Sequence, residues 1–148
     1  MPPMNVIAGD IFRRVDAYID DLFAPEDEVL LGAQARARAA GLPEIQVSAN
    51  QGKLLYLFAK LIGARTILEV GTLAGYSTIW LARALPADGR LITLEMDPDH
   101  ARVARENIEA ANLAPRVEVV TGPALDTLPT LEGAGWAPFD LVFLDADK

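Results

Sequence analysis

Four short apolar runs separated by helical segments constrain the fold of this chain more than any other feature. The runs are rich in Ile, Val and Leu and read RTILEVG, RLITLEM, VEVVTG and FDLVFLD. Helices are predicted between them over Tyr76 to Leu85, Pro98 to Ala111 and Ala124 to Leu131. Strands that alternate with helices of this length form βαβ units, which assemble a parallel sheet with right-handed crossovers. The sequence therefore predicts a doubly wound α/β fold.

The residues before the first apolar run are predicted to be helical. An amphipathic stripe with three- and four-residue spacing is formed by Ile11, Val15, Tyr18, Ile19 and Leu22. Two further helices are predicted over Glu26 to Ala40 and Asn50 to Gly63, the first of them stopped by Gly41 and Pro43. We therefore predict a helical section over residues 1–63 that packs on an α/β core over residues 64–148, in one domain overall.

Composition argues against several classes of protein. The formal net charge of −8, with only three lysines, argues against a nucleic-acid partner, which needs clustered Lys and Arg. No run of about 18 apolar residues is present, and no secretory signal pattern begins the chain, so we expect no membrane span and a cytoplasmic location. Because the chain has no cysteine, disulfides, thiolate nucleophiles and zinc knuckles are excluded.

The residues that follow each strand are the candidates for function, because open parallel sheets bind ligands at the carboxyl ends of their strands. After the first run comes the turn GTLAG, from Gly71 to Gly75, which leads into a helix. Its glycines allow close backbone approach to a ligand, and the helix N-terminus favours an anion, with Ser77 as a further donor. Leu73 stands where a dinucleotide fingerprint needs glycine, which leaves room for a smaller anion such as a carboxylate. A tight turn without a ligand is the alternative.

Two carboxylates belong to these strand ends. Glu95 ends RLITLE and is placed to accept hydrogen bonds from both hydroxyls of a ribose, with a solvated carboxylate as the alternative. Met96 beside it is expected either to pack on an adenine or to join the core. Glu69 lies inside the apolar run ILEVG, where a carboxylate needs a partner. It either contacts a ligand or pairs with a nearby donor, and we favour the ligand.

The single histidine, His100, follows Asp97 and Pro98, which are predicted to cap and begin a helix. Without a cysteine or a second histidine, it cannot anchor a zinc site. We expect His100 on exposed helix surface.

Taken together, LEVGTLAGYST, LEMD, GPALDTLP and FDLVFLDADK resemble, in order and spacing, the cation-dependent O-methyltransferases of the caffeoyl-CoA and catechol type. The resemblance covers most of the chain. It implies the Rossmann-like fold of class I methyltransferases, S-adenosylmethionine as cofactor, a divalent cation such as Mg²⁺ and a small aromatic hydroxyl substrate. It also implies a homodimer.

The resemblance further implies roles for individual residues. Cofactor binding is implied for Val47, Glu69, Gly71, Thr72, Ser77, Glu95, Ala124 and Asp147. Within this set, Ser77 would hold the methionine carboxylate, Glu95 the ribose, and Ala124 the adenine through its main chain. Asp145 would be a metal ligand and Lys148 the general base.

The sequence departs from the family where it stops. In the family an adjacent Asp-Asn pair from a later strand completes the metal site, and nothing follows Lys148 here. The run LVFL also reads as a strand buried on both faces, which would be an exposed apolar edge if it were the last strand. We therefore expect a C-terminally truncated enzyme, inactive by itself. The alternatives are an NAD(P)-dependent oxidoreductase, disfavoured by Leu73, and a non-catalytic α/β binding module.

Overall fold

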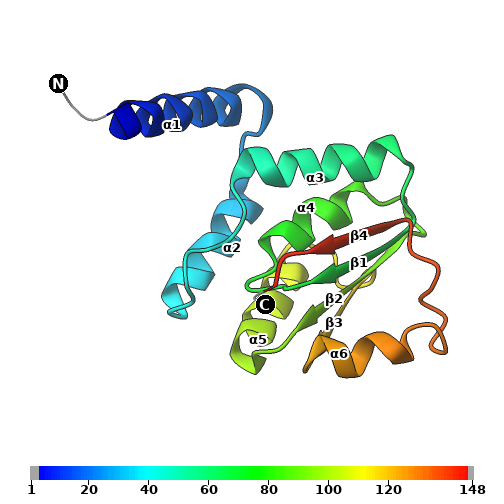
Figure 1. Ribbon diagram of the computed structural model, residues 1–148. Coiled ribbons are helices and arrows are strands. Elements are labelled where there is room, and N and C mark those ends of the chain that lie inside the picture. Colours follow the sequence, from blue (N-terminus) through cyan, green and yellow to red (C-terminus); the bar gives the residue numbers. More distant parts are fainter. Residues whose placement is uncertain (1–3, 147–148) are drawn as a thin grey trace.

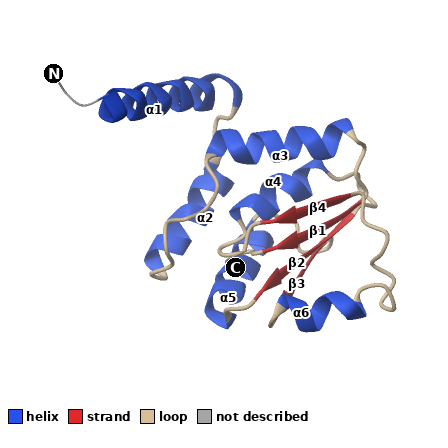
Figure 2. Ribbon diagram, viewed as in Figure 1, coloured by secondary structure: helices blue, strands red, loops and turns tan. Residues whose placement is uncertain are grey.

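The computed structural model describes residues 4–146 and contains one parallel sheet with helices on both faces (Figures 1 and 2). The strands are β1 (Thr66–Val70), β2 (Arg90–Glu95), β3 (Val117–Thr121) and β4 (Leu141–Leu144). Between them lie α4 (Tyr76–Ala84), α5 (Pro98–Ala110), and α6 (Ala124–Thr127) with the 3₁₀ helix η1 (Leu128–Thr130). The predicted doubly wound α/β fold is confirmed, and each predicted strand and helix of the core is present.

The order of the strands creates a natural binding position. The sheet runs β3-β2-β1-β4 with every pair parallel. The chain moves outward from β1 through β2 to β3, and then returns to the other side of β1 to form β4. The strand order therefore reverses between β1 and β4, and the crevice beyond the carboxyl ends at such a switch point is where doubly wound sheets bind ligands.

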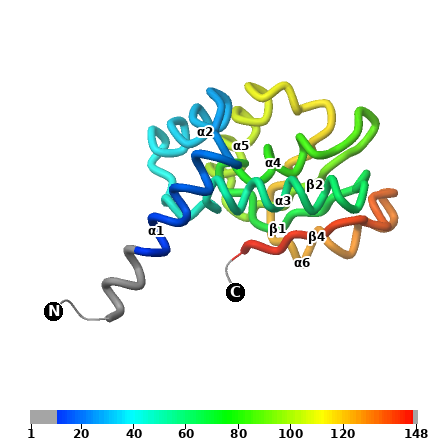
Figure 3. The backbone as a smooth tube through the Cα atoms, turned by 90° about the horizontal axis from the view of Figure 1, so that it is seen from above, coloured from blue at the N-terminus to red at the C-terminus, as the bar shows by residue number. Residues whose placement is uncertain are grey.

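Three helices precede the sheet: α1 (Met4–Phe23), α2 (Glu28–Ala39) and α3 (Ala49–Leu61). The α3 helix lies against α4, where a Cβ at Gly52 would overlap the Trp80 ring, so only glycine permits this packing. The α1 helix extends away from the sheet (Figures 1 and 3) and leaves Phe12, Tyr18 and Phe23 exposed. No helix within residues 4–146 combines the length and the apolar character needed to cross a bilayer.

Successive residues of a strand point to opposite faces of the sheet, so the strands contribute to two apolar cores, one on each face. On the face covered by α4 and α5, the core includes Ile67, Leu91, Ile79, Leu81 and Ile108. On the opposite face, the core comprises Leu68, Val70, Ile92, Leu94 and Leu131. The central strands β1 and β2 are therefore buried on both faces.

The expectation that LVFL is buried on both faces is wrong for the described residues. Leu141 and Phe143 pack against the α4 side, whereas Val142 and Leu144 are 51% and 73% exposed. The physical reason is that α6, on the opposite face, packs against β2 rather than β4 (Figure 1).

Candidate functional site

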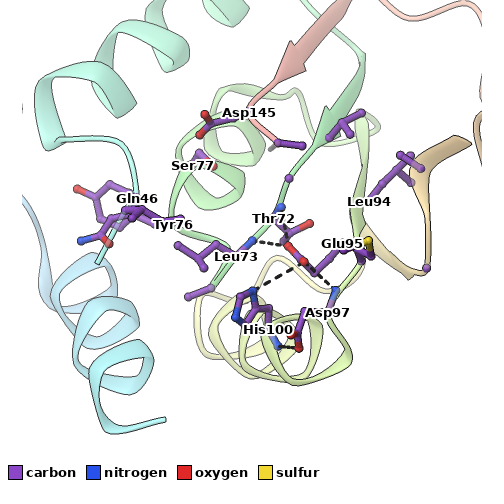
Figure 4. Close-up of a pocket in the computed structure, with 18 of the residues that line it drawn as sticks. Gln46, Thr72, Leu73, Tyr76, Ser77, Leu94, Glu95, Asp97, His100 and Asp145 are labelled. Carbon is purple, nitrogen blue, oxygen red and sulfur yellow. Dashed lines mark hydrogen bonds and ion pairs between the residues drawn. The ribbon is translucent and has the colours of Figure 1, made fainter. Parts of the chain in front are cut away.

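A cavity of about 780 Å³ lies at the carboxyl end of the sheet (Figure 4). Its wall is built by the loop before α3 and by the segments that follow β1, β2, β3 and β4. Of the residues singled out from the sequence, it brings together Val47, Gly71, Thr72, Ser77, Glu95, Ala124 and Asp145. Glu69 is not among the residues of the wall, and Asp147 and Lys148 lie outside the described residues.

The turn between β1 and α4 has a backbone that glycine makes accessible. Gly71, Leu73 and Gly75 have φ values of +98°, +50° and +80°, a region that L side chains rarely occupy. At Gly71 a Cβ would also overlap the carbonyl oxygen of Asp145, so this strand end approaches β4 too closely for any side chain. Gly75 gives α4 no side-chain cap. The first N–H groups of α4 are therefore left for another acceptor, such as a ligand carboxylate.

Glu95 holds this turn in place. Its Oε2 accepts hydrogen bonds from the N–H groups of Thr72 and Leu73, at 3.0 and 2.7 Å. Its Oε1 accepts from the N–H of Asp97 at 2.9 Å. The residue is only 8% exposed, so the alternative of a solvated strand-end carboxylate is wrong. Glu95 is a carboxylate fixed by backbone donors at the edge of the cavity.

Glu69 faces the α4 side of the sheet and is fully buried. Its carboxylate accepts hydrogen bonds from Ser77 Oγ and Thr93 Oγ1, both at 2.7 Å, and from Thr78 Oγ1. Burial raises its pKa to about 7, and the nearby charge of Asp145 acts in the same direction, against the three hydroxyl donors. The ligand contact that we favoured for Glu69 is therefore not found, and the alternative, pairing with nearby donors, is what the structure shows.

This pairing also changes what Ser77 can offer a ligand. The Ser77 hydroxyl hydrogen is already given to Glu69, although the residue borders the cavity. Toward a carboxylate, Ser77 therefore presents its backbone N–H in the first turn of α4 rather than its hydroxyl hydrogen.

Asp145 directly follows β4, and its N–H donates to the carbonyl of Val70 at 2.8 Å. Its side chain faces the cavity near Ser77 (Figure 4). Within residues 4–146 no three His, Cys, Asp or Glu side chains are close enough together to hold a metal ion. One carboxylate does not supply the six oxygen ligands that Mg²⁺ prefers, so the described residues do not by themselves fit a magnesium site.

Two residues of the wall were interpreted differently from the sequence. His100 was expected on exposed helix surface, but it borders the cavity, with its Nδ1 3.8 Å from Glu95 Oε1 (Figure 4). The predicted cap explains this position, because Asp97 accepts from the N–H of Asp99 and begins α5 beside Glu95. Met96 is 72% exposed and also borders the cavity, so the core alternative for it is wrong.

Tyr76 was missed in the sequence and also lines the cavity. Its hydroxyl donates to Glu26 Oε1 at 2.6 Å, which connects α4 to the segment before α2. Burial, together with this carboxylate, raises the pKa of Tyr76, so it stays a neutral donor. The sequence signal was its place directly after Gly75, at the start of a helix that borders the predicted ligand.

Comparison with known proteins is consistent with this geometry. A model of the O-methyltransferase family matches residues 23–148. The chain is 58% identical over 140 residues to a catechol O-methyltransferase of Niastella koreensis, covering 95% of this chain and 63% of that protein.

Solved structures agree in fold. The crystal structure of an O-methyltransferase from Bacillus cereus in complex with S-adenosylhomocysteine (SAH) matches with a TM-score of 0.88 and 52% identity, over 91% of this chain and 61% of that one. An O-methyltransferase from Streptomyces achromogenes in complex with S-adenosylmethionine matches with a TM-score of 0.86 and 52% identity, over 91% and 60%. The chain thus spans less than two thirds of the length of these relatives. Both its sequence and its fold place this chain in the O-methyltransferase family.

Proposed function

We propose that this chain carries the S-adenosylmethionine site of an O-methyltransferase that methylates a hydroxyl of a small, catechol-like aromatic acceptor. The observation that carries the proposal is the cavity itself. There, the uncapped start of α4 and the carboxylate of Glu95 face the same space from neighbouring strand ends. An anion-binding helix start beside a fixed acceptor suits an amino acid joined to a nucleoside.

Each wall segment has a task in this proposal. The N–H groups at the start of α4, including that of Ser77, bind the methionine carboxylate. Gly71 and Thr72 line the methionine part, where the absence of a Cβ at Gly71 keeps the backbone close. Glu95 accepts hydrogen bonds from the ribose. The main chain of Val47 and of Ala124 closes the two sides of the cavity, the latter next to the adenine.

The cofactor supplies a methyl group on a sulfonium, from which an in-line displacement forms the oxygen–carbon bond as the sulfur–carbon bond breaks. The chain contributes chiefly by holding donor and acceptor in one geometry. A phenolic hydroxyl, with a pKa of about 10, is a weak nucleophile at neutral pH and needs a proton acceptor. We assign that role to Lys148, which stands two residues after Ala146 of the cavity wall in the sequence.

A divalent cation is part of the proposal, with Asp145 as one ligand. Because the described residues supply one carboxylate and no group of three, the other ligands would have to come from outside them. No step of the reaction is assigned to the cation. The catechol-like acceptor is supported by the similarity to the catechol O-methyltransferase of Niastella koreensis.

A homodimer completes the proposal. Its support is the amphipathic stripe of α1, where Ile11, Val15, Tyr18 and Leu22 share one helix face and are 52%, 48%, 65% and 55% exposed, an apolar surface that a second copy would cover. Light scattering of the chain and of the variant Val15→Asp tests this: the variant should shift toward the monomer mass, and a monomeric parent chain would refute it.

Calorimetry with SAH and NADH tests the cofactor assignment. We expect SAH to bind and NADH not to bind, because Leu73 occupies the place of the second fingerprint glycine. Binding of NADH without binding of SAH would overturn the proposal in favour of an oxidoreductase.

The metal and base assignments need methyl-transfer measurements in a version of the protein extended to the length of its relatives. Asp145→Ala should abolish metal-stimulated transfer to catechol while leaving SAH affinity largely unchanged. Lys148→Met should reduce turnover more at low pH than at high pH, where the phenol ionises unaided. Full activity in a chelator would refute the metal role, and a loss independent of pH would refute the base.

A further inference from the structure

Asn107 of α5 is a fully buried polar residue whose side chain connects three parts of the fold. Its amide donates to the carbonyl of Ala74 at 2.8 Å and to the carbonyl of Ala33 at 3.3 Å. Its Oδ1 accepts from Nε of Arg36. Both donors and the acceptor of the amide are therefore used, as the burial of a polar group requires. Ala33 and Arg36 belong to α2, whereas Ala74 belongs to the turn between β1 and α4 that borders the cavity.

The peptide unit that joins Ala74 to Gly75 is fixed at both of its polar ends. Its carbonyl is held by Asn107, and the N–H of Gly75 donates to the carbonyl of Thr72 at 2.8 Å. The same part of the turn rests on α5, because Ala104 lies 3.5 Å from the place where a Cβ would stand at Gly75. Since Ala104 and Asn107 are three residues apart, they contact the turn from one face of α5.

The orientation of this peptide unit decides where the start of α4 points. Gly75 directly precedes α4 and has a φ of +80°, and glycine adopts many other φ values at little cost. The backbone of the turn therefore does not by itself select one orientation of the peptide. The next N–H groups, of Tyr76 and Ser77, are those that the proposed site offers to the methionine carboxylate. A hydrogen bond that fixes the preceding peptide also fixes the direction of these donors.

We propose that Asn107 is a positioning residue for the carboxylate end of the cofactor. It lies outside the cavity wall and acts through the carbonyl of Ala74, where it selects the peptide orientation that turns the first N–H groups of α4 toward the ligand. All three hydrogen bonds of Asn107 lead to α2 or to this turn, whereas the nucleoside is held by the segments after β2 and β3. The inference rests on the proposed function and names a buried residue on which binding of the amino-acid part depends.

Two ligands that share the nucleoside but differ at the amino-acid end test the inference. SAH carries the carboxylate, whereas methylthioadenosine ends in a methyl group on the same sulfur. Asn107→Leu keeps most of the side-chain volume and removes both donors. Isothermal titration should give a Kd for SAH about 5- to 10-fold higher than in the parent chain, the size expected for one lost hydrogen bond. The Kd for methylthioadenosine should change by less than about twofold.

Arg36→Met is the matched control, because it removes the partner of Asn107 Oδ1 and leaves the bond to Ala74 in place. It should change both Kd values by less than about twofold. Asn107→Asp makes an independent test, because an ionised carboxylate still accepts from Arg36 but has no hydrogen for the carbonyl of Ala74. It should show the same loss, confined to SAH. Agreement with Asn107→Leu, which introduces no charge, excludes charge repulsion as the cause.

The outcomes separate this inference from the proposed function. If SAH binds the parent chain and the Asn107 variants weaken both ligands equally, the role of Asn107 is structural, and the inference is refuted while the cofactor assignment stands. The same conclusion follows if circular dichroism shows that neither variant folds, or if folded variants bind SAH as the parent does. If SAH does not bind the parent chain, the proposed function fails together with the inference.

Discussion

The ends of β1 and β2 carry two carboxylates that look alike in the sequence and differ in the structure. Glu69 is fully buried among the hydroxyls of Ser77, Thr78 and Thr93, whereas Glu95 is held by backbone N–H groups at the cavity edge. Glu69 lies one residue before the end of its strand, and Glu95 is the last residue of its own. In the sheet register Glu69 pairs with Thr93, so Glu95 lies two residues farther toward the carboxyl edge on the same face. That difference decides whether the side chain enters the core or reaches the ligand-binding edge. The first carboxylate stabilises the fold, and the second is available to a ligand.

The largest expected effect is on stability, from removing the acceptor in the buried cluster. Glu69→Ala leaves three hydroxyls without their acceptor and creates a cavity, so we expect the free energy of unfolding to fall by about 3–4 kcal/mol. Urea unfolding measures the loss. Glu69→Gln is the matched control, because it keeps the volume and one acceptor oxygen, and it should lose less than half as much. Equal losses in the two variants would show that the hydrogen bonds at Glu69 do not stabilise the fold.

Gly71 lies in the turn that Glu95 holds, where the end of β1 comes close to the end of β4. Gly71→Ala combines a disfavoured φ of +98° with overlap on the carbonyl of Asp145, and should cost about 2–3 kcal/mol. Gly41→Ala is the control, because its φ is +75° with nothing within 4 Å of the added Cβ, and strain alone should cost about 1 kcal/mol. The difference between the two unfolding free energies isolates the contact. Equal losses in the two variants would mean that the ends of β1 and β4 can move apart with little loss of unfolding free energy.

Ligand binding should reverse the ranking of the two carboxylates. Glu95→Gln removes the charge that holds the Thr72 N–H and that, in the proposed function, accepts hydrogen bonds from the ribose. We therefore expect the Kd for SAH to rise about 10- to 100-fold. Glu69→Gln, which does not border the cavity, should change that Kd by less than about threefold. Isothermal titration of both variants makes the comparison. If both substitutions weaken SAH binding to the same extent, the distinction between a structural and a binding carboxylate is refuted.

The elements of the fold could be predicted because their signals are local. The runs around Ile67, Leu91 and Val117 are short, β-branched and bounded by turns, and Asp97 with Pro98 marks a helix start. The exposure of Val142 could not be predicted, since it depends on where α6 packs across the sheet. Periodicity tells which residues share a face, but not whether another element covers that face.

The site was predictable in its place and less so in its contacts. Strand-end chemistry identified the wall that contains Gly71 and Glu95. The partners of Glu69 come from α4 and from Thr93, which is paired with it across β1 and β2. That pairing requires the strand register, which no local pattern supplies. The expectation that His100 lies on exposed helix surface was wrong for a similar reason, because a helix start must be placed next to β2 before a surface histidine becomes part of a cavity.

The smallest expected effect is a dependence of stability on pH that belongs to Glu69 alone. Burial raises its pKa from 4.5 to about 7, so between these values the folded chain binds a proton that the unfolded chain does not. This contribution to stability is full below pH 4.5 and is lost as the pH rises through about 7. From about pH 7.5 to about pH 5.5 the parent chain should therefore gain about 1–2 kcal/mol relative to Glu69→Gln, whose amide does not titrate. Urea unfolding of both proteins at the two pH values measures the change. A constant difference would mean that the hydroxyls of Ser77, Thr78 and Thr93 offset burial completely. Glu69 would then stay ionised in the core.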